Sequence, residues 1–190
     1  AFYETVIGWG MTTGHGENNE YGFITAQDGA MVGGQLRLGK EMTEHGAQPC
    51  WLGYVGVDDV DASLKAIEAA GGTVLMPATD IAMAGRVALA ADCCGAPFYV
   101  MAPTPPPGGG ESTAFAPQPN PGHCGWNELH ASHPDKAIAF YTGLFGWTLP
   151  PPMDMGPMGT YRLFATQAGE GLGGMMNSPN FPRPSWLVYF

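Results

Sequence analysis

The chain has 190 residues, a net charge of −10, 45% hydrophobic residues and 13% charged residues, a composition typical of a folded globular protein. Only seven residues are lysine or arginine, so the chain lacks the positive charge that binding to nucleic-acid phosphates requires. No apolar run approaches the roughly 20 residues that span a bilayer. We therefore expect neither a nucleic-acid partner nor a membrane partner.

The cysteines give no sign of a disulfide framework or a zinc site. Cys50, Cys93, Cys94 and Cys124 form no CxxC pair and no zinc-ligand spacing. Such cysteines are typical of reduced, small apolar residues in a reducing compartment. We expect a cytoplasmic protein.

The chain opens with a stretch that it later repeats. "AFYETVIGW" at residues 1–9 returns as "AFYTGLFGW" at 139–147, and "EYGFITAQDGAMVGGQ" at 20–35 aligns with "TYRLFATQAGEGLGGM" at 160–175. "CWLGYV" and "SWLVYF" follow in the same order. An ordered series of matches indicates an internal repeat. The first copy has no counterpart of the strand that precedes the second, so we interpret the chain as a window on a longer two-module protein.

The clearest predicted helix lies in "DDVDASLKAIEAAGG". Asp58 or Asp59 can cap its first N–H groups, and two glycines end it. Val60, Leu64 and Ile67 recur at helical spacing and form an apolar stripe. Short β-type runs follow this helix: "TVLMP", "RVALAAD" and "PFYVM".

A second helix is predicted from "SHPDKAIAFY". Ser132 or His133 can cap it, Pro134 suits the first helical position, and Asp135 favours the helix dipole. The runs "TYRLFAT" and "GLGGMM" follow. Each unit therefore consists of a strand, a helix and about three strands.

A segment rich in proline and glycine, residues 104–122, separates the modules. Its composition predicts a semi-rigid linker. We expect a first module at 1–103 that lacks its first strand, and a second module at 123–190 that stops after the first strand of its second unit.

The motifs "FYxxxFGW", "VDDVDA" followed by "GG", and "GRVALAAD" followed by "GAPFYVMAP" resemble the vicinal oxygen chelate superfamily, in particular its tandem glyoxalase/bleomycin-resistance/dioxygenase-like proteins. The resemblance implies an α+β fold of repeated βαβββ units that form curved mixed sheets. Two units would pair into a half-barrel whose concave face holds the ligand. It also implies units at about 1–48, 49–103 and 123–184.

The metal positions that the resemblance implies carry unsuitable side chains. Trp126, Leu52 and Leu187 occupy the first-strand ligand position of successive units, and Tyr99 occupies the customary glutamate position. None of them is a normal ligand for a hard divalent ion. Gln35 lies near a fourth position. We therefore predict no cofactor.

Glu128 and His130 offer the best alternative for a metal or for catalysis. Strand alternation puts them on one face together with Trp126, and a carboxylate with an imidazole is a plausible ligand pair. Two ligands do not make a site, and the pair can equally line a pocket. A divalent metal stays an alternative.

The remaining candidates are aromatic residues and one methionine on the predicted strands, which would line the concave cup. These predicted ligand-binding residues are Trp51, Tyr54, Tyr99, Met101, Trp126, Trp186 and Tyr189. Such a surface suits a flat, apolar or cationic small molecule.

We therefore predict small-molecule binding by a glyoxalase/bleomycin-resistance-like protein without the usual metal site. The alternative is a lyase, isomerase or dioxygenase-type enzyme that uses Glu128 and His130. Open sheet edges also predict a homodimer or strand exchange.

Overall fold

The computed structural model describes residues 2–12, 21–81, 84–104, 112–118, 120–178, 181 and 183–190. The chain divides into two compact units. The first unit comprises Ala1–Trp51, Glu111–Trp126 and Tyr189–Phe190, and the second comprises Leu52–Gly110 and Asn127–Val188. This division rests on spatial contacts, whereas the predicted modules 1–103 and 123–190 rest on the sequence repeat and stay a prediction. Within the predicted linker, residues 105–111 and 119 lie outside the described residues.

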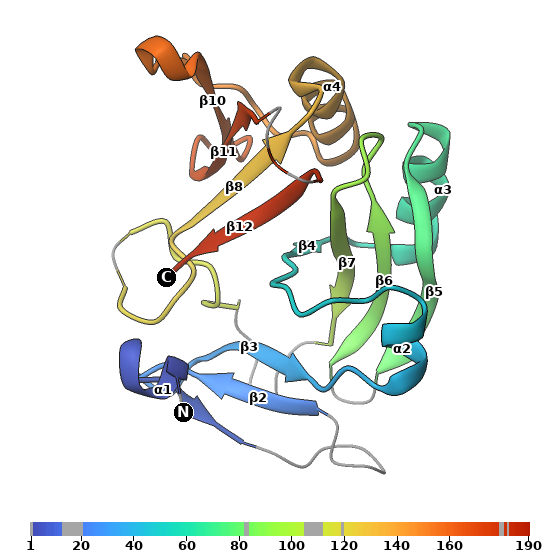
Figure 1. Cartoon of the computed structure of the whole chain (residues 1–190), viewed down its shortest axis with the longest axis vertical. Helices are drawn as coiled ribbons and strands as arrows, with labels where there is room; N and C mark the ends of the chain where they lie inside the picture. The colour runs from blue at the N-terminus through green and yellow to red at the C-terminus, as the bar shows by residue number, and fades with distance from the viewer. Residues whose placement is uncertain are drawn as a thin grey trace. The chain divides into compact units, whose positions relative to one another are not determined.

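The first unit contains two short helices and a three-stranded antiparallel sheet of order β1-β2-β3 (Figure 1). Its elements are α1 (Phe2–Val6), β1 (Gly10–Met11), β2 (Tyr21–Thr25), β3 (Met31–Leu36) and α2 (Lys40–Glu44). The buried Trp9 donates its indole N–H to the carbonyl oxygen of Gly122 at 2.7 Å, which ties the end of the predicted linker to this unit. The sequence did not predict α2, a helix of five residues whose first turn has no side-chain cap.

The second unit begins with a complete βαβββ repeat. Its elements are β4 (Tyr54–Gly56), α3 (Val60–Ala69), β5 (Thr73–Ile81), β6 (Gly85–Ala91) and β7 (Pro97–Pro103), with strand order β4-β7-β6-β5. β4 and β7 are parallel, and the other pairs are antiparallel. Asp59 caps α3, because its side chain accepts the N–H of Ala62 at 3.0 Å. The predicted helix and the three strands after it are confirmed.

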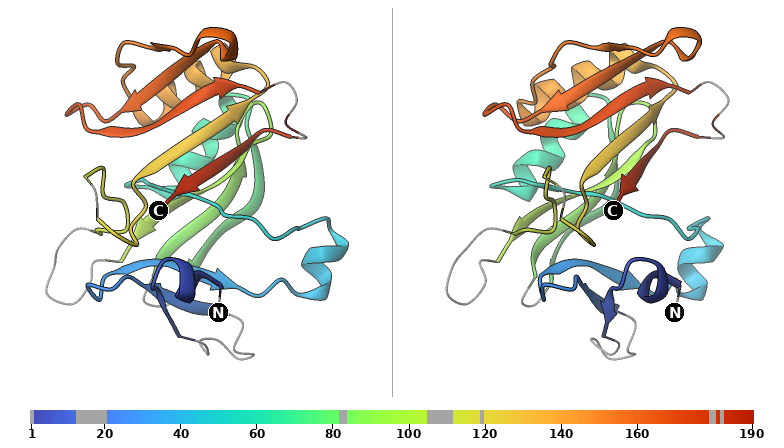
Figure 2. Two further views of the ribbon diagram at one scale, coloured as in Figure 1. Left: turned by 60° about the vertical axis from the view of Figure 1, so that its left-hand side comes forward. Right: turned by 90° about the vertical axis from the view of Figure 1, so that its left-hand side faces the viewer.

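The second repeat follows the same order. Its elements are β8 (Trp126–Ala131), α4 (Pro134–Phe145), β9 (Met153–Asp154), the 3₁₀ helix η1 (Gly156–Met158), β10 (Thr160–Ala165), β11 (Gly171–Asn177) and β12 (Ser185–Tyr189). The sheet has the order β12-β8-β11-β10-β9, in which β8 and β11 are parallel (Figure 2). The order β8-β11-β10-β9 matches β4-β7-β6-β5, so the predicted α+β fold of repeated βαβββ units with curved mixed sheets is confirmed.

One hydrophobic core lies against both helices of the second unit. Its largest fully buried members include Ile67 of α3, Tyr141 of α4, Phe98 of β7 and Leu129 of β8. Core residues fill one face of each sheet. Because alternate strand residues point to opposite faces, the residues between them lie on the face turned away from the core. None of the described helices is long and apolar enough to cross a bilayer.

A buried polar chain runs through this core. Asp92 is only 3% exposed, and its Oδ1 accepts the N–H groups of Cys94 and Ala96. The Tyr141 hydroxyl donates to Asp92 Oδ2 at 3.1 Å and accepts the indole N–H of Trp186 at 3.0 Å. The chain links the β6–β7 turn to α4 and β12.

Candidate functional site

The candidate site is built on β8. Leu129 and Ala131 point into the core, where they are 0% and 1% exposed. Because side chains alternate along a strand, Glu128 and His130 share the opposite face of the sheet. The structure therefore brings together the two residues that the sequence singled out.

Glu128 is held by contacts at both carboxylate oxygens. The Tyr161 hydroxyl donates to Oε2 at 2.9 Å, and Oε1 lies 2.8 Å from His130 Nε2. Gly174 of β11 is the register partner of Glu128. A Cβ atom on Gly174 would collide with the Tyr161 ring. The glycine is needed so that the tyrosine can cross β11 and reach Glu128.

His130 is fixed on several sides. Its Nδ1 lies 2.7 Å from Ser178 Oγ, and its ring stacks on Phe181 with centroids 4.1 Å apart and planes 18° apart. Nε2 is buried, and within the described residues it has no well-aligned hydrogen-bond partner, although Glu128 Oε1 approaches to 2.8 Å off the ideal line. Two facing lone pairs would repel at 2.8 Å, so the short contact favours the tautomer with a proton on Nε2. In that tautomer Nδ1 can accept a hydrogen bond from the Ser178 hydroxyl.

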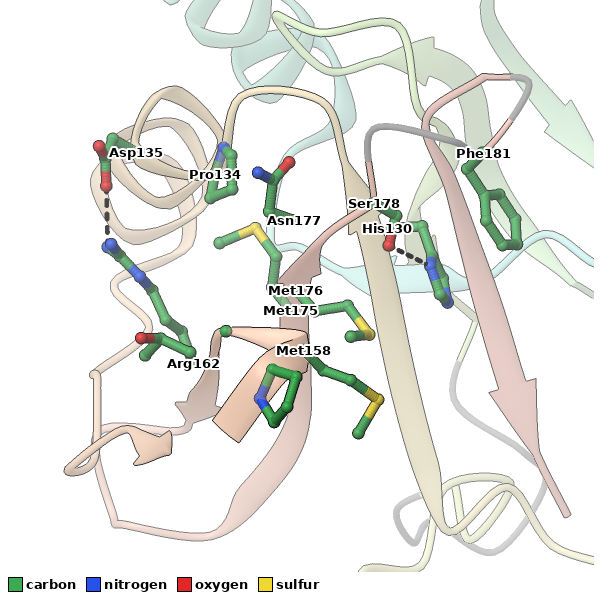
Figure 3. Close-up of a pocket in the computed structure, with 13 residues that line it drawn as sticks. His130, Pro134, Asp135, Met158, Arg162, Met175, Met176, Asn177, Ser178 and Phe181 are labelled. Atoms are coloured by element: carbon green, nitrogen blue, oxygen red, sulfur yellow. Dashed lines mark hydrogen bonds and ion pairs between the residues drawn. The ribbon is translucent and has the colours of Figure 1, made fainter. Parts of the chain in front are cut away.

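A cavity of about 850 Å³ opens beside His130 (Figure 3). On the other side of the cavity, Arg162 pairs with Asp135 at 2.9 Å, so these charges balance each other (Figure 3). The residues that line the cavity are His130, Pro134, Asp135, Pro157, Met158, Gly159, Thr160, Arg162, Met175, Met176, Asn177, Ser178 and Phe181. The lining combines sulfur and aromatic surface with a few polar groups, as small-molecule sites do.

Three of the predicted ligand-binding residues lie on the paired strands β4 and β7: Tyr54, Tyr99 and Met101. Tyr54 stacks on Tyr99 with centroids 4.5 Å apart and planes 7° apart. Met101 follows Tyr99 by two residues on β7 and so shares its face. None of the three lines the cavity beside His130.

Trp186 of β12 packs against aromatic residues of the core. Its ring packs against Tyr141, Trp147 and Phe164, and it is partly buried against the core. Its face of β12 turns toward α4. Its indole N–H is used by the buried polar chain.

Trp51, Trp126 and Tyr189 belong to the first unit. Trp51 was expected on a strand, but β4 begins only at Tyr54, and the Trp51 indole N–H donates to the Tyr3 hydroxyl at 2.9 Å. The seven predicted ligand-binding residues therefore do not form a single cluster within either unit.

The described residues do not form a complete metal site. Among the described residues, no group of three or more histidine, cysteine, aspartate or glutamate side chains could hold an ion. Glu128 and His130 supply two ligand types, but their contacts are made to Tyr161, Ser178 and each other.

Sequence reasoning missed several residues of the site, chiefly Tyr161, Ser178 and Phe181. For Tyr161 a signal was available in the repeat itself. Tyr21 and Gly34 of the first copy align with Tyr161 and Gly174, and a Cβ atom on Gly34 would likewise collide with the Tyr21 ring. A tyrosine that crosses a glycine is thus common to both copies.

Two curated relatives cover the whole chain. CFP32 of Mycobacterium tuberculosis, provisionally named a glyoxylase, is 33% identical over 192 residues, which are 100% of this chain and 70% of the relative. The anthracycline biosynthesis protein DnrV of Streptomyces peucetius is 32% identical over 202 residues, again 100% of this chain and 70% of the relative. No model of a known protein family matches the chain.

Solved structures show the same fold at low identity. The Mn(II)-bound glyoxalase of Novosphingobium aromaticivorans matches with a TM-score of 0.63 and 17% identity, over 94% of this chain and 56% of that one. The 2,2',3-trihydroxybiphenyl 1,2-dioxygenase of Sphingomonas wittichii RW1 matches with a TM-score of 0.58 and 14% identity, over 98% and 64%. This chain thus spans less than two thirds of either protein.

Proposed function

Because the chain belongs to the vicinal oxygen chelate superfamily of glyoxalase-like proteins, we propose that it binds a flat, mainly apolar small molecule in the cavity beside His130, without the usual metal. The cavity carries this proposal. Its volume of about 850 Å³ falls within the range of roughly 300–1,000 Å³ that is usual for small-molecule sites. The proposed contacts are the apolar side chains of Met158, Met176 and Phe181, with Ser178 and Asn177 as orienting polar groups.

One relative suggests a ligand class. DnrV is named for anthracycline biosynthesis, and anthracyclines combine flat fused rings with a cationic amino sugar. The net charge of −10 favours a cationic ligand over an anionic one. We propose flat aromatic compounds of this kind as the first to test.

The test is a fluorescence titration of the protein with doxorubicin, and in parallel with its neutral aglycone. Phe181→Ala and Met176→Ala should each weaken binding about tenfold, equivalent to about 1.4 kcal/mol, because each removes apolar contact from the cavity. Met153→Ala is the matched control, since Met153 is exposed and does not line the cavity. No binding of either compound at high micromolar concentration, or equal effects of all three variants, would argue against the proposal.

Absence of a metal is part of the proposal and needs its own measurement. Protein purified without chelator should contain no stoichiometric Zn, Mn, Ni or Fe by elemental analysis. A stoichiometric metal would show that Glu128 and His130 have found further ligands. It would also shift the balance toward an enzyme.

A second candidate function rests on the 2.8 Å contact between Glu128 and His130. A carboxylate next to an imidazole can remove a proton from a bound carbonyl compound, as a lyase, isomerase or dioxygenase-type reaction would need. NMR can follow exchange of the α-protons of hydroxyacetone in D₂O. Exchange that the protein accelerates and Glu128→Gln abolishes would favour this function, and no acceleration would count against it.

We further propose a cytoplasmic homodimer that forms through a sheet edge. Among the described strands, β4 stands at the edge of its sheet, and an uncovered edge can pair with a second chain. Light scattering across a range of protein concentrations should then give twice the monomer mass at the upper end. A monomer mass throughout would remove the proposal.

A further inference from the structure

We propose that Ser178 is a nucleophile that accepts an acyl group from small, neutral carboxylic esters. His130 is its general base, and Glu128 orients the histidine and stabilises its protonated form. The inference uses the same cavity as the proposed ligand site but goes beyond non-covalent binding.

The three side chains form a chain of contacts. Ser178 Oγ lies 2.7 Å from His130 Nδ1, and His130 Nε2 lies 2.8 Å from Glu128 Oε1. A nucleophile next to a base, with the base oriented by a third group, is the arrangement that activates a serine hydroxyl. Here the ring nitrogens have exchanged the roles they have in serine proteases, but either nitrogen of imidazole can act as the base.

The surroundings of His130 favour one tautomer of its ring. The carboxylate of Glu128 can only accept hydrogen bonds and already accepts one from the Tyr161 hydroxyl. A carboxylate oxygen 2.8 Å from Nε2 favours the tautomer with the proton there, and in that tautomer the lone pair of Nδ1 faces the Ser178 hydroxyl. His130 is 8% exposed, so little water competes for that lone pair.

Neighbouring side chains hold His130 and Glu128 in place. Phe181 stacks on the imidazole at 4.1 Å and so fixes the plane of the ring. Tyr161 holds the carboxylate of Glu128 at 2.9 Å, and the hydroxyl reaches it because Gly174 leaves the space. Catalytic groups work best when their surroundings fix their rotamers.

The cavity indicates the class of ester. Ser178 and His130 both line it, and Met158, Met176 and Phe181 offer apolar surface for an acyl chain. Of the described lining residues only Arg162 carries positive charge, and it is paired with Asp135 at 2.9 Å. The site thus suits a neutral, apolar acyl group rather than an acid.

The reaction proceeds in two steps. Ser178 Oγ attacks the ester carbonyl carbon while its proton passes to His130 Nδ1, and the C–O bond to the leaving group breaks as His130 returns the proton to the departing alcohol. Water then attacks the acyl carbon while His130 takes its proton, the acyl C–Oγ bond breaks, and His130 returns the proton to Ser178 Oγ. The net reaction converts ester and water to acid and alcohol. The Glu128 carboxylate stabilises the imidazolium that forms in each step.

In the test, the full chain is incubated with p-nitrophenyl butyrate and the reaction is stopped with acid. Peptide mass spectrometry then locates the butyryl group. We expect the acyl group on Ser178 and release of p-nitrophenol that saturates with substrate. His130→Asn should slow acylation at least about 100-fold, the lower end of the usual contribution of a general base. Ser178→Ala should abolish the adduct, and Ser63→Ala is the matched control, because Ser63 Oγ donates to the Asp59 carbonyl and has no histidine beside it.

Ser178→Cys guards against loss of fold, because a thiol at the same place should still be acylated, and more slowly when His130 is also replaced. An adduct on other residues, or an acylation rate at Ser178 that His130→Asn leaves unchanged, overturns the inference. Doxorubicin binding by Ser178→Ala is measured in parallel. If doxorubicin binds but the parent protein is not acylated, only the proposal of a nucleophilic Ser178 is overturned. If doxorubicin does not bind but acylation of the parent protein is normal, only the proposed ligand is overturned.

Discussion

Replacing Tyr141 with phenylalanine should destabilise the protein although the ring and its packing are kept. Tyr141 is fully buried, and its hydroxyl serves two partners: it donates to Asp92 Oδ2 at 3.1 Å and accepts from Trp186 Nε1 at 3.0 Å. Phenylalanine leaves both partners without this contact. Asp92 cannot turn away, because its Oδ1 accepts the N–H groups of Cys94 and Ala96.

The size of the effect follows from these partners. A buried polar group left unsatisfied costs about 1–3 kcal/mol, and a charged one lies toward the upper end. Asp92, at 3% exposed, should therefore account for most of the loss, and the partly buried Trp186 for about 1 kcal/mol. We expect the free energy of unfolding to fall by about 2–4 kcal/mol, a large fraction of the roughly 5–15 kcal/mol of a typical domain.

The assay is equilibrium unfolding in urea, followed by circular dichroism and tryptophan fluorescence. The midpoint should fall while the slope with denaturant stays constant, since the same surface is exposed on unfolding. Tyr189→Phe is the matched control: Tyr189 is 47% exposed, so water can replace what its hydroxyl loses, and the change should stay within about 0.5 kcal/mol. A Tyr141→Phe protein as stable as the parent would refute the reasoning, because Asp92 would then have another partner.

Three further predictions concern other sites. Gly174→Ala should displace the Tyr161 ring and lower stability by about 1–3 kcal/mol; an unchanged melting temperature would contradict this close approach. Burial, then the neighbouring thiol, raises the pKa of Cys94 to about 11, so iodoacetamide at pH 8 should label the exposed Cys50 well before Cys94, as peptide mapping can verify. The backbone N–H of Ala30 donates to Asp28 Oδ1 at 2.9 Å and lowers the pKa of the Asp28 carboxyl. The ionised carboxyl therefore contributes stability above its ordinary pKa of 3.8, and this stability is lost as pH falls through the lowered value. Asp28→Asn should therefore flatten the acid limb of stability against pH, and an unaltered acid limb would speak against that contribution.

Much of the fold could be predicted because it depends on local patterns and on the repeat. The apolar spacing of Val60, Leu64 and Ile67, with Asp59 as cap, determines α3 within the chain itself. The repeated blocks predicted two strand–helix–strand units, and both sheets have the same strand order. The short α2 was missed because it has neither an apolar stripe nor a side-chain cap.

The candidate site was predicted only where strand alternation suffices. Glu128 and His130 are two residues apart on β8, so their shared face follows from the period of a strand. For the other predicted residues, the prediction depended on which face of the sheet packs against the helices. No local pattern fixes that face for Trp186, which packs against the core.

The sequence by itself determined the repeated βαβββ architecture, through the repeated blocks, and the shared face of Glu128 and His130, through the two-residue period of a strand. Only the tertiary structure decided what surrounds that pair. Tyr161 and Ser178 lie 33 and 48 residues away along the chain from the groups they contact, and their approach depends on the register of β8, β10 and β11. Register follows from the packing of whole sheets against the helices, which brings a serine, a histidine and a glutamate together beside one cavity.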